Sequence, residues 1–141
     1  MNKLFVYGTL KYIQFTDEEK KDYEGWKVVS GQARTKPEYD LLSFTEFPAV
    51  FEGGASKVEG ALLEVDDTAL SVCDRIESEG KFYHRKKIRL EKPSVDAYIY
   101  VCGSEHKAFA AEDRSIVDLG DETKVWIPWG IRSFLGEEKQ P

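Results

Sequence analysis

The spacing of hydrophobic residues along the chain predicts a series of short strands. Residues 4–7 form an uninterrupted apolar run that ends at Gly8, which is typical of a strand buried on both faces. Residues 57–65 form a second strong strand, and residues 82–92 and 95–102 have the pattern of the two arms of a hairpin. Weaker extended segments are expected at residues 26–33, 39–42 and 47–51.

A helix with a clear apolar stripe is expected in mid-chain, at residues 67–78. Leu70, Cys73 and Glu77 follow one another at i, i+3 and i+7, so Glu77 falls on the stripe that should face the core. Burial raises the pKa of a carboxyl group, which is how an acid becomes a general base near neutral pH. The alternative is that the helix has frayed by Glu77 and the carboxylate points to water. Shorter helices are expected to begin at Thr16 and Glu105.

These elements favour an α+β fold. Five or more strands, mostly connected locally, with one substantial helix argue for a strongly curved or barrel-like mixed sheet with flanking helices. The chain has 141 residues, which is the length of one ordinary domain. We therefore expect a single domain over residues 1–141, in which the portion from about residue 104 shows the weakest pattern.

Composition and charge narrow the class of protein. The chain is 41% hydrophobic and 13% aromatic, which is typical of a folded globular protein. Its formal net charge of -6 disfavours binding to nucleic acid or to an anionic membrane surface, although Arg85, Lys86, Lys87 and Arg89 are clustered. No apolar run reaches the roughly 18 residues of a membrane span, and no secretory signal pattern is seen at the N-terminus. The expected location is the cytoplasm.

The cysteines and histidines do not suggest a metal site. Cys73 and Cys102 are far apart in the sequence, and neither has metal-ligand spacing with His84 or His106. We interpret both cysteines as small core residues in a reducing compartment.

The glycine turn after the first strand is a candidate binding loop. Because Gly8 has no Cβ, the N–H groups around it can approach an anion or a developing oxyanion. Gly8, Thr9 and Leu10 could therefore cradle a ligand. The alternative is a strand that ends in an ordinary turn.

Several segments in a fixed order resemble one protein family. They are residues 6–10 followed by Lys11, residues 47–50, residues 58–65, and Asp74-Arg75-Ile76-Glu77 followed by Tyr83-x-Arg85. Together they resemble the gamma-glutamylcyclotransferase-like family over roughly residues 3–102. The resemblance implies a small mixed barrel with flanking helices.

The resemblance also implies a reaction and a site. In that family the α-amine of a γ-glutamyl group attacks its own side-chain carbonyl, which releases an amine and 5-oxoproline without a metal or organic cofactor. Glu77 would be the general base. The turn from Tyr7 to Leu10, which includes Gly8 and Thr9, would bind the γ-glutamyl group through its N–H groups. Tyr83 and Arg85 follow the acid at the family's spacing and share one side of a strand. We expect Arg85 to pair with a carboxylate such as Asp74, the alternative being that it binds the ligand, and Tyr83 to form a wall of the pocket.

Departures from the family pattern leave the substrate open. Lys11 to Phe15 contain no glycine, Cys73 stands in place of a leucine, and Ser78 stands in place of a glycine. The last third of the chain matches no motif, so the leaving amine is not defined. The oligomeric state is not indicated. The alternative function is a non-catalytic small-molecule-binding or interaction module that keeps the same fold and pocket.

Overall fold

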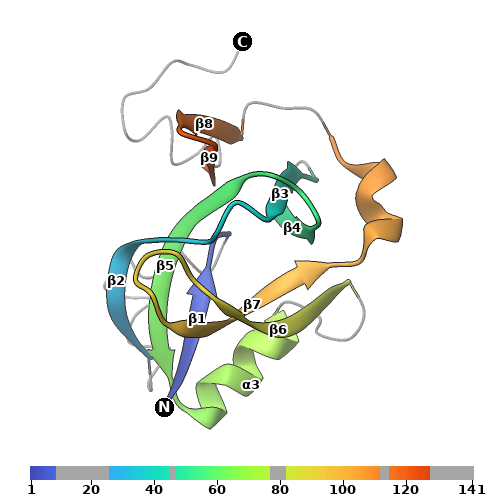
Figure 1. Cartoon of the computed structure of the whole chain (residues 1–141). Coiled ribbons are helices and arrows are strands. Elements are labelled where there is room, and N and C mark those ends of the chain that lie inside the picture. The colour runs from blue at the N-terminus through green and yellow to red at the C-terminus, as the bar shows by residue number, and fades with distance from the viewer. Residues whose placement is uncertain (9–25, 45–46, 77–81, 112–114, 128–141) are drawn as a thin grey trace.

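The computed structural model describes residues 1–8, 26–44, 47–76, 82–111 and 115–127 (Figure 1). The strands in these ranges are β1 (Asn2–Val6), β2 (Trp26–Arg34), β3 (Tyr39–Ser43), β4 (Pro48–Glu52), β5 (Lys57–Val65), β6 (Tyr83–Arg89), β7 (Asp96–Cys102), β8 (Ile116–Gly120) and β9 (Thr123–Trp126). The helices in these ranges are α3 (Asp67–Ile76) and the short 3-10 helix η1 (Ser104–Phe109). In this part of the chain no helix is both long and apolar enough to span a membrane.

The strands form one mixed, strongly curved sheet that approaches a closed barrel (Figure 1). The main path through the sheet is β3-β4-β7-β1-β5-β9-β8, and β2 and β6 are added on β5 and β7. β1 lies near the centre, antiparallel to β5 and parallel to β7. The α+β barrel-like fold expected from the sequence is therefore confirmed.

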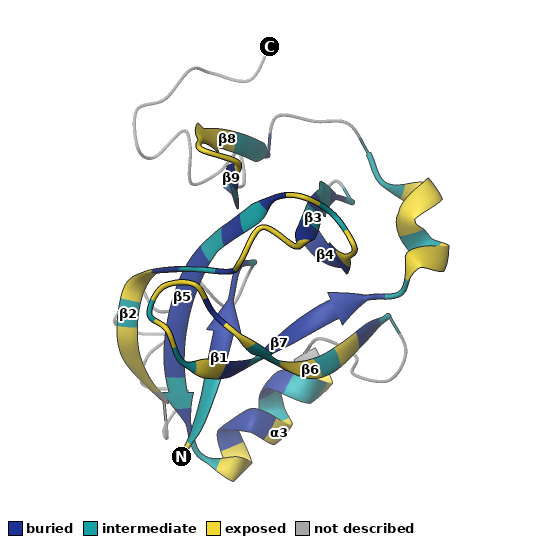
Figure 2. Ribbon diagram, viewed as in Figure 1, coloured by how far each residue is buried: buried dark blue, intermediate teal, exposed yellow. Residues whose placement is uncertain are grey.

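Strand β1 separates two hydrophobic clusters because its side chains alternate between the faces of the sheet. Leu4 and Val6 belong to the cluster that also contains Leu70 and Cys73 of α3. Phe5 and Tyr7 belong to the second cluster, on the other face. Figure 2 shows the resulting buried path along β1, β5 and β7. The prediction of a first strand buried on both faces is confirmed.

Close packing of β1 against β5 depends on Gly60. A Cβ at this position would lie 2.2 Å from the carbonyl oxygen of Val6 and 2.9 Å from Cζ of Phe5. Only glycine allows the backbones to approach this closely without displacement. The end of β1, where the candidate binding turn begins, is thereby held against β5.

Most of the expected elements are found close to their expected bounds. The second strong strand matches β5, and residues 83–89 and 96–102 form the antiparallel hairpin of β6 and β7. Helix α3 begins at Asp67, and the Oδ1 atom of Asp66 caps it by accepting a hydrogen bond from the N–H of Ala69 at 2.7 Å. β2 contains register shifts on both sides of Ser30, which mark β-bulges or irregular pairing next to Gly31.

Two expectations about the second half need correction. The helix expected from Glu105 is the 3-10 helix η1, and it ends at Phe109. The last third of the chain, which showed the weakest pattern, contains the antiparallel pair β8 and β9. Strand β9 also pairs with β5. The helix expected from Thr16 lies outside the described residues.

Candidate active site

Strand β7 changes its partner along one edge, and the candidate site lies at that change. Tyr98 of β7 pairs in parallel with Leu4 of β1, and Val101 pairs in parallel with Val50 of β4. β6 occupies the other edge of β7 along its whole length. β1 therefore ends, and β4 begins, along the same edge of β7. The carboxyl end of a parallel strand, at a point where its neighbour changes partner, is a common position for ligand sites.

Tyr7 fills this junction with its side chain. Its hydroxyl group donates a hydrogen bond to the carbonyl oxygen of Tyr100 at 2.6 Å and accepts one from the N–H of Val50 at 3.3 Å. The residue is 6% exposed. The phenol of Tyr7 thus ties the end of β1 to both β7 and β4, and is a structural group. A contact between the Tyr7 to Leu10 turn and a ligand through backbone N–H groups stays a prediction.

Gly8 follows directly and lies against Pro48, the first residue of β4. A Cβ on Gly8 would lie 3.0 Å from Cγ and 3.2 Å from Cδ of the proline ring. These separations are tighter than ordinary van der Waals contact, so a larger residue would push the ring away. Gly8 thus lies close to Pro48, whereas its approach to a ligand stays a prediction.

Tyr83, at the start of β6, contacts the same proline, although it lies 35 positions after Pro48 in the chain. Its hydroxyl group donates a hydrogen bond to the carbonyl oxygen of Pro48 at 2.6 Å, and the side chain is buried. The structure thus brings together two of the predicted site residues, Gly8 and Tyr83, through their shared contact with Pro48. Pro48 falls in one of the segments that resemble the family, residues 47–50, but its part in the site was missed.

The other predicted site residues are Thr9, Leu10 and Glu77, and they lie outside the described residues. Glu77 directly follows Ile76, the last residue of α3. Leu70 and Cys73 of the same predicted stripe are buried in the core, as expected. The burial of Glu77 beside the Gly8 turn stays a prediction.

Asp74 fixes the last turn of α3 to the sheet. Its Oδ2 atom accepts a hydrogen bond from Nη1 of Arg85 at 2.7 Å, and this ion pair is the one expected from the sequence. Its Oδ1 atom accepts a second hydrogen bond, also 2.7 Å long, from the hydroxyl group of Tyr100. Charge-assisted hydrogen bonds of this kind are among the stronger ones in proteins. Tyr100 was missed in the sequence, although a tyrosine with its ring on a core-facing row usually has a partner for its hydroxyl group.

An aromatic cluster includes Phe47, the residue before Pro48. Phe44 and Phe47 stack with their ring centroids 5.6 Å apart, and Phe82 meets both rings edge to face at 5.4 and 5.5 Å. Phe82 also contacts Tyr83, with centroids 4.9 Å apart. Through Tyr83, which donates a hydrogen bond to Pro48, this cluster is connected to the candidate site. The signal for Phe82 was its position next to Tyr83.

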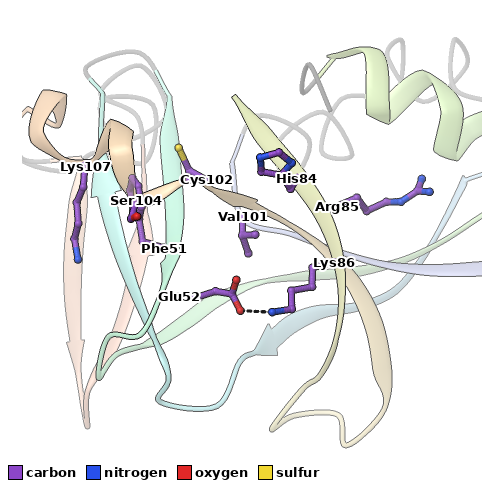
Figure 3. A pocket seen from close by; sticks show the side chains of 10 residues that line it. Phe51, Glu52, His84, Arg85, Lys86, Val101, Cys102, Ser104 and Lys107 are labelled. Atoms are coloured by element: carbon purple, nitrogen blue, oxygen red, sulfur yellow. Dashed lines mark hydrogen bonds and ion pairs between the residues drawn. The ribbon is translucent and has the colours of Figure 1, made fainter. Parts of the chain in front are cut away.

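A separate cavity of about 470 Å³ lies beside the ends of β4 and β7 (Figure 3). His84 lines this cavity, whereas its neighbour Tyr83 faces the cluster under α3, because adjacent strand residues point to opposite faces. Glu52 and Lys86 form an ion pair of 2.5 Å at its wall. Burial raises the pKa of Cys102 to about 11, so this thiol is a poor nucleophile at neutral pH. None of the described residues lining the cavity is a predicted site residue.

Comparison with known proteins shows that the chain is similar to members of one family. The family described as "Gamma-glutamyl cyclotransferase, AIG2-like" matches residues 4–126. A Vibrio cholerae protein named "Putative gamma-glutamylcyclotransferase" is 34% identical over 118 residues, which cover 84% of this chain and 92% of that protein. A Drosophila melanogaster protein with the same descriptive name is 27% identical over 108 residues, covering 70% of this chain and 68% of the relative.

Solved structures share the fold. The crystal structure of an AIG2-like protein from Mus musculus superposes with a TM-score of 0.65 at 22% identity, covering 100% of this chain and 96% of that chain. A structure described as a gamma-glutamyl cyclotransferase gives a TM-score of 0.56 at 12% identity, covering 72% of this chain and 66% of that one. The chain belongs to the gamma-glutamyl cyclotransferase, AIG2-like family.

Proposed function

We propose that the protein is an enzyme that releases an amine and 5-oxoproline from a γ-glutamyl amine or peptide. Membership of the family supports this class of reaction. The observation that carries the proposal is the meeting of Gly8 and Tyr83 on Pro48. These residues come from three distant segments, and two of them belong to the motifs that the family resemblance assigned to the substrate.

The reaction needs a base and a group that stabilises negative charge. In the proposed mechanism Glu77 takes a proton from the substrate α-ammonium, because an ammonium group is not nucleophilic. The amine nitrogen then forms a bond to the side-chain carbonyl carbon, which closes a five-membered ring. Glu77 gives this first proton to the leaving nitrogen, and as the tetrahedral intermediate collapses the bond from that carbon to the leaving nitrogen breaks. The ring nitrogen then loses its second proton to Glu77, which passes it to the released amine, so 5-oxoproline keeps one N–H and the amine leaves as an ammonium ion. No water is consumed.

The contacts of the described residues support a role for the turn in the proposed reaction. In this proposal backbone N–H groups of the turn from Tyr7 to Leu10 stabilise the oxyanion. The phenol of Tyr7 is engaged by Tyr100 and Val50, so it serves to hold the turn in place. Pro48, which lies against Gly8, supports the turn on one side.

We place this reaction in the cytoplasm. Cys73 and Cys102 are both buried thiols, which fits a reducing compartment. The leaving amine is left open, because the segments that match the family pattern concern the γ-glutamyl group.

The direct test is an assay for 5-oxoproline. The full-length chain is incubated with γ-glutamyl amines, γ-glutamyl dipeptides and glutathione, and 5-oxoproline is quantified by mass spectrometry. We expect release from at least one member of the panel in proportion to enzyme concentration, with the amine formed in equal amount. Tight binding of one of these compounds without any turnover would contradict the proposal and favour the non-catalytic binding module.

A further inference from the structure

A chain of hydrogen bonds crosses the molecule from α3 to the candidate binding turn. It starts at Asp74, whose two carboxylate oxygens accept hydrogen bonds from Arg85 and Tyr100, each at 2.7 Å. It continues through the backbone of Tyr100, whose carbonyl oxygen accepts a hydrogen bond from the hydroxyl group of Tyr7 at 2.6 Å. It ends at Tyr7, whose hydroxyl oxygen also accepts a hydrogen bond from the N–H of Val50 on β4 at 3.3 Å.

The two ends of this chain lie next to the two parts of the proposed site. Asp74 is in the last turn of α3, three positions before Glu77. Tyr7 directly precedes Gly8 in the turn. The intervening residue, Tyr100, is 3% exposed, so the middle of the chain is shielded from competition with water.

We propose that Asp74 and Tyr100 are positioning residues that hold the last turn of α3 in a fixed relation to the Tyr7–Gly8 turn. The inference rests on the proposed function in so far as Glu77 and the turn act on the same substrate. A displacement of about 1 Å between reacting groups can lower a rate about a hundredfold. A rigid link between the element that precedes the base and the turn that binds the substrate therefore has a direct kinetic consequence.

The link is suited to the pH range in which an amine substrate loses its proton. Burial, followed by the hydrogen bond to Asp74, raises the pKa of Tyr100 far above its ordinary value of 10.0. The phenol therefore remains a hydrogen-bond donor under mildly alkaline conditions. This hydrogen bond to Asp74 is thus maintained while the substrate titrates.

The kinetic test uses Tyr100→Phe and Asp74→Asn, with Tyr98→Phe as the matched control. Tyr98 lies two positions before Tyr100 on β7 and contacts Arg85 through its ring, but it is only partly buried. All rates are measured where unfolding curves show each variant fully folded. We expect kcat for 5-oxoproline release to fall by about tenfold or more in both test variants, with KM changed less than about threefold and the control unchanged.

A second readout does not depend on turnover. In ¹⁵N-labelled protein, Asp74→Asn and Tyr100→Phe should shift the amide resonance of Gly8 and accelerate its hydrogen exchange, whereas Tyr98→Phe should leave both unchanged. If Tyr100→Phe does not fold, Asp74→Asn carries the test alone, because the Asp74 side chain is 27% exposed and its replacement keeps the same shape.

The outcomes separate this inference from the proposed function. An unchanged Gly8 resonance in the test variants shows that the two elements are not linked and overturns the inference, even if the wild-type protein is active. A changed resonance with an unchanged kcat also overturns it, because the bonds would then serve stability alone. A changed resonance in a protein that turns over no γ-glutamyl compound supports the link and rejects the proposed function.

Discussion

At the scale of single residues, three buried tyrosines near the site act as hydrogen-bond donors within the scaffold. Tyr7 donates to the Tyr100 carbonyl group, Tyr83 to the Pro48 carbonyl group, and Tyr100 to Asp74. Removal of such a donor leaves a buried acceptor unsatisfied, which costs about 1–3 kcal/mol. The hydroxyl groups are therefore fixed by structural bonds, and the proposed ligand contacts fall to the turn after β1.

The contact between Gly8 and Pro48 gives a prediction for Gly8→Ala. The new methyl group would lie 3.0 Å from Cγ of Pro48, so the ring or the turn must move. We expect a loss of about 1 kcal/mol in the free energy of unfolding. We also expect a several-fold increase in KM for 5-oxoproline release, because the turn proposed to bind the substrate is displaced. Urea unfolding and steady-state kinetics measure the two effects.

Gly31→Ala is the matched control for this substitution. No atom lies within 4 Å of a Cβ at that position, so we expect a change in stability within about 0.5 kcal/mol and no change in KM. Equal changes in the free energy of unfolding and in KM for the two variants would show that the close approach of Gly8 to Pro48 has no energetic or functional consequence.

At the scale of elements, the sequence predicted those strands and helices whose pattern is local. β5 and the hairpin of β6 and β7 have the length and the apolar spacing of strands, and α3 has both an apolar stripe and a capping aspartate. β8 could not be predicted in this way, because its residues are half-buried or exposed and show no alternation. β8 forms through pairing with β9, which in turn pairs with Lys57 and Val58 of β5. Such a strand depends on tertiary contacts more than on its own residues.

The residues of the candidate site also differ in whether a local pattern reveals them. Gly8 and Glu77 were identified because each is unusual within its own element: a glycine that ends a buried strand and an acid on an apolar stripe. Tyr100 was not identified, because its partner Asp74 lies 26 positions away in the chain. The part played by Pro48 likewise depends on Gly8 and Tyr83, which reach it from other strands.

An ionic cluster joins the ends of three elements and gives a prediction for pH dependence. Glu91, which follows β6, accepts a hydrogen bond from Nε of Arg34 at 2.8 Å and lies 3.2 Å from Nζ of Lys57. The hydrogen bond from Lys57, followed by that from Arg34, lowers the pKa of Glu91, and the contact with Glu91 raises the pKa of Lys57. The stabilisation by Glu91 is thus present above its unfolded-state pKa and is lost as the pH falls through its lower folded-state pKa. The stabilisation by Lys57 is present below its unfolded-state pKa and is lost only at alkaline pH, as the pH rises through its higher folded-state pKa.

Glu91→Gln should therefore lower the urea midpoint at pH 7, and the difference from the wild-type protein should shrink as the pH falls below about 4. The effect should be modest, because the side chains are partly exposed. Asp96→Asn, which removes the more exposed ion pair with Arg89, is the control and should change the midpoint less. A difference between Glu91→Gln and the wild-type protein that is constant from pH 3 to pH 7 would contradict this interpretation.

At the scale of the whole molecule, the candidate site follows from how the sheet is assembled. β1 and β4 run parallel to β7 and follow one another along the same edge of it. The turn after β1 therefore meets the start of β4, and the phenol of Tyr7 closes the junction. Helix α3 covers one face of the sheet, and Asp74 in its last turn is tied to β6 and β7 (Figure 1). This topology connects the end of β1 and the end of α3, which are far apart in the sequence.

The most direct test of the proposed chemistry is the rate of 5-oxoproline release by Glu77→Gln relative to the wild-type protein. Glutamine keeps the size of the side chain but cannot accept the proton of the substrate amine. We expect turnover to fall by about a hundredfold to ten-thousandfold, with the fold retained and ligand affinity reduced much less. Glu38→Gln, which removes an exposed carboxylate, is the matched control and should keep full activity. Undiminished turnover by Glu77→Gln would contradict the assignment of Glu77 as the base.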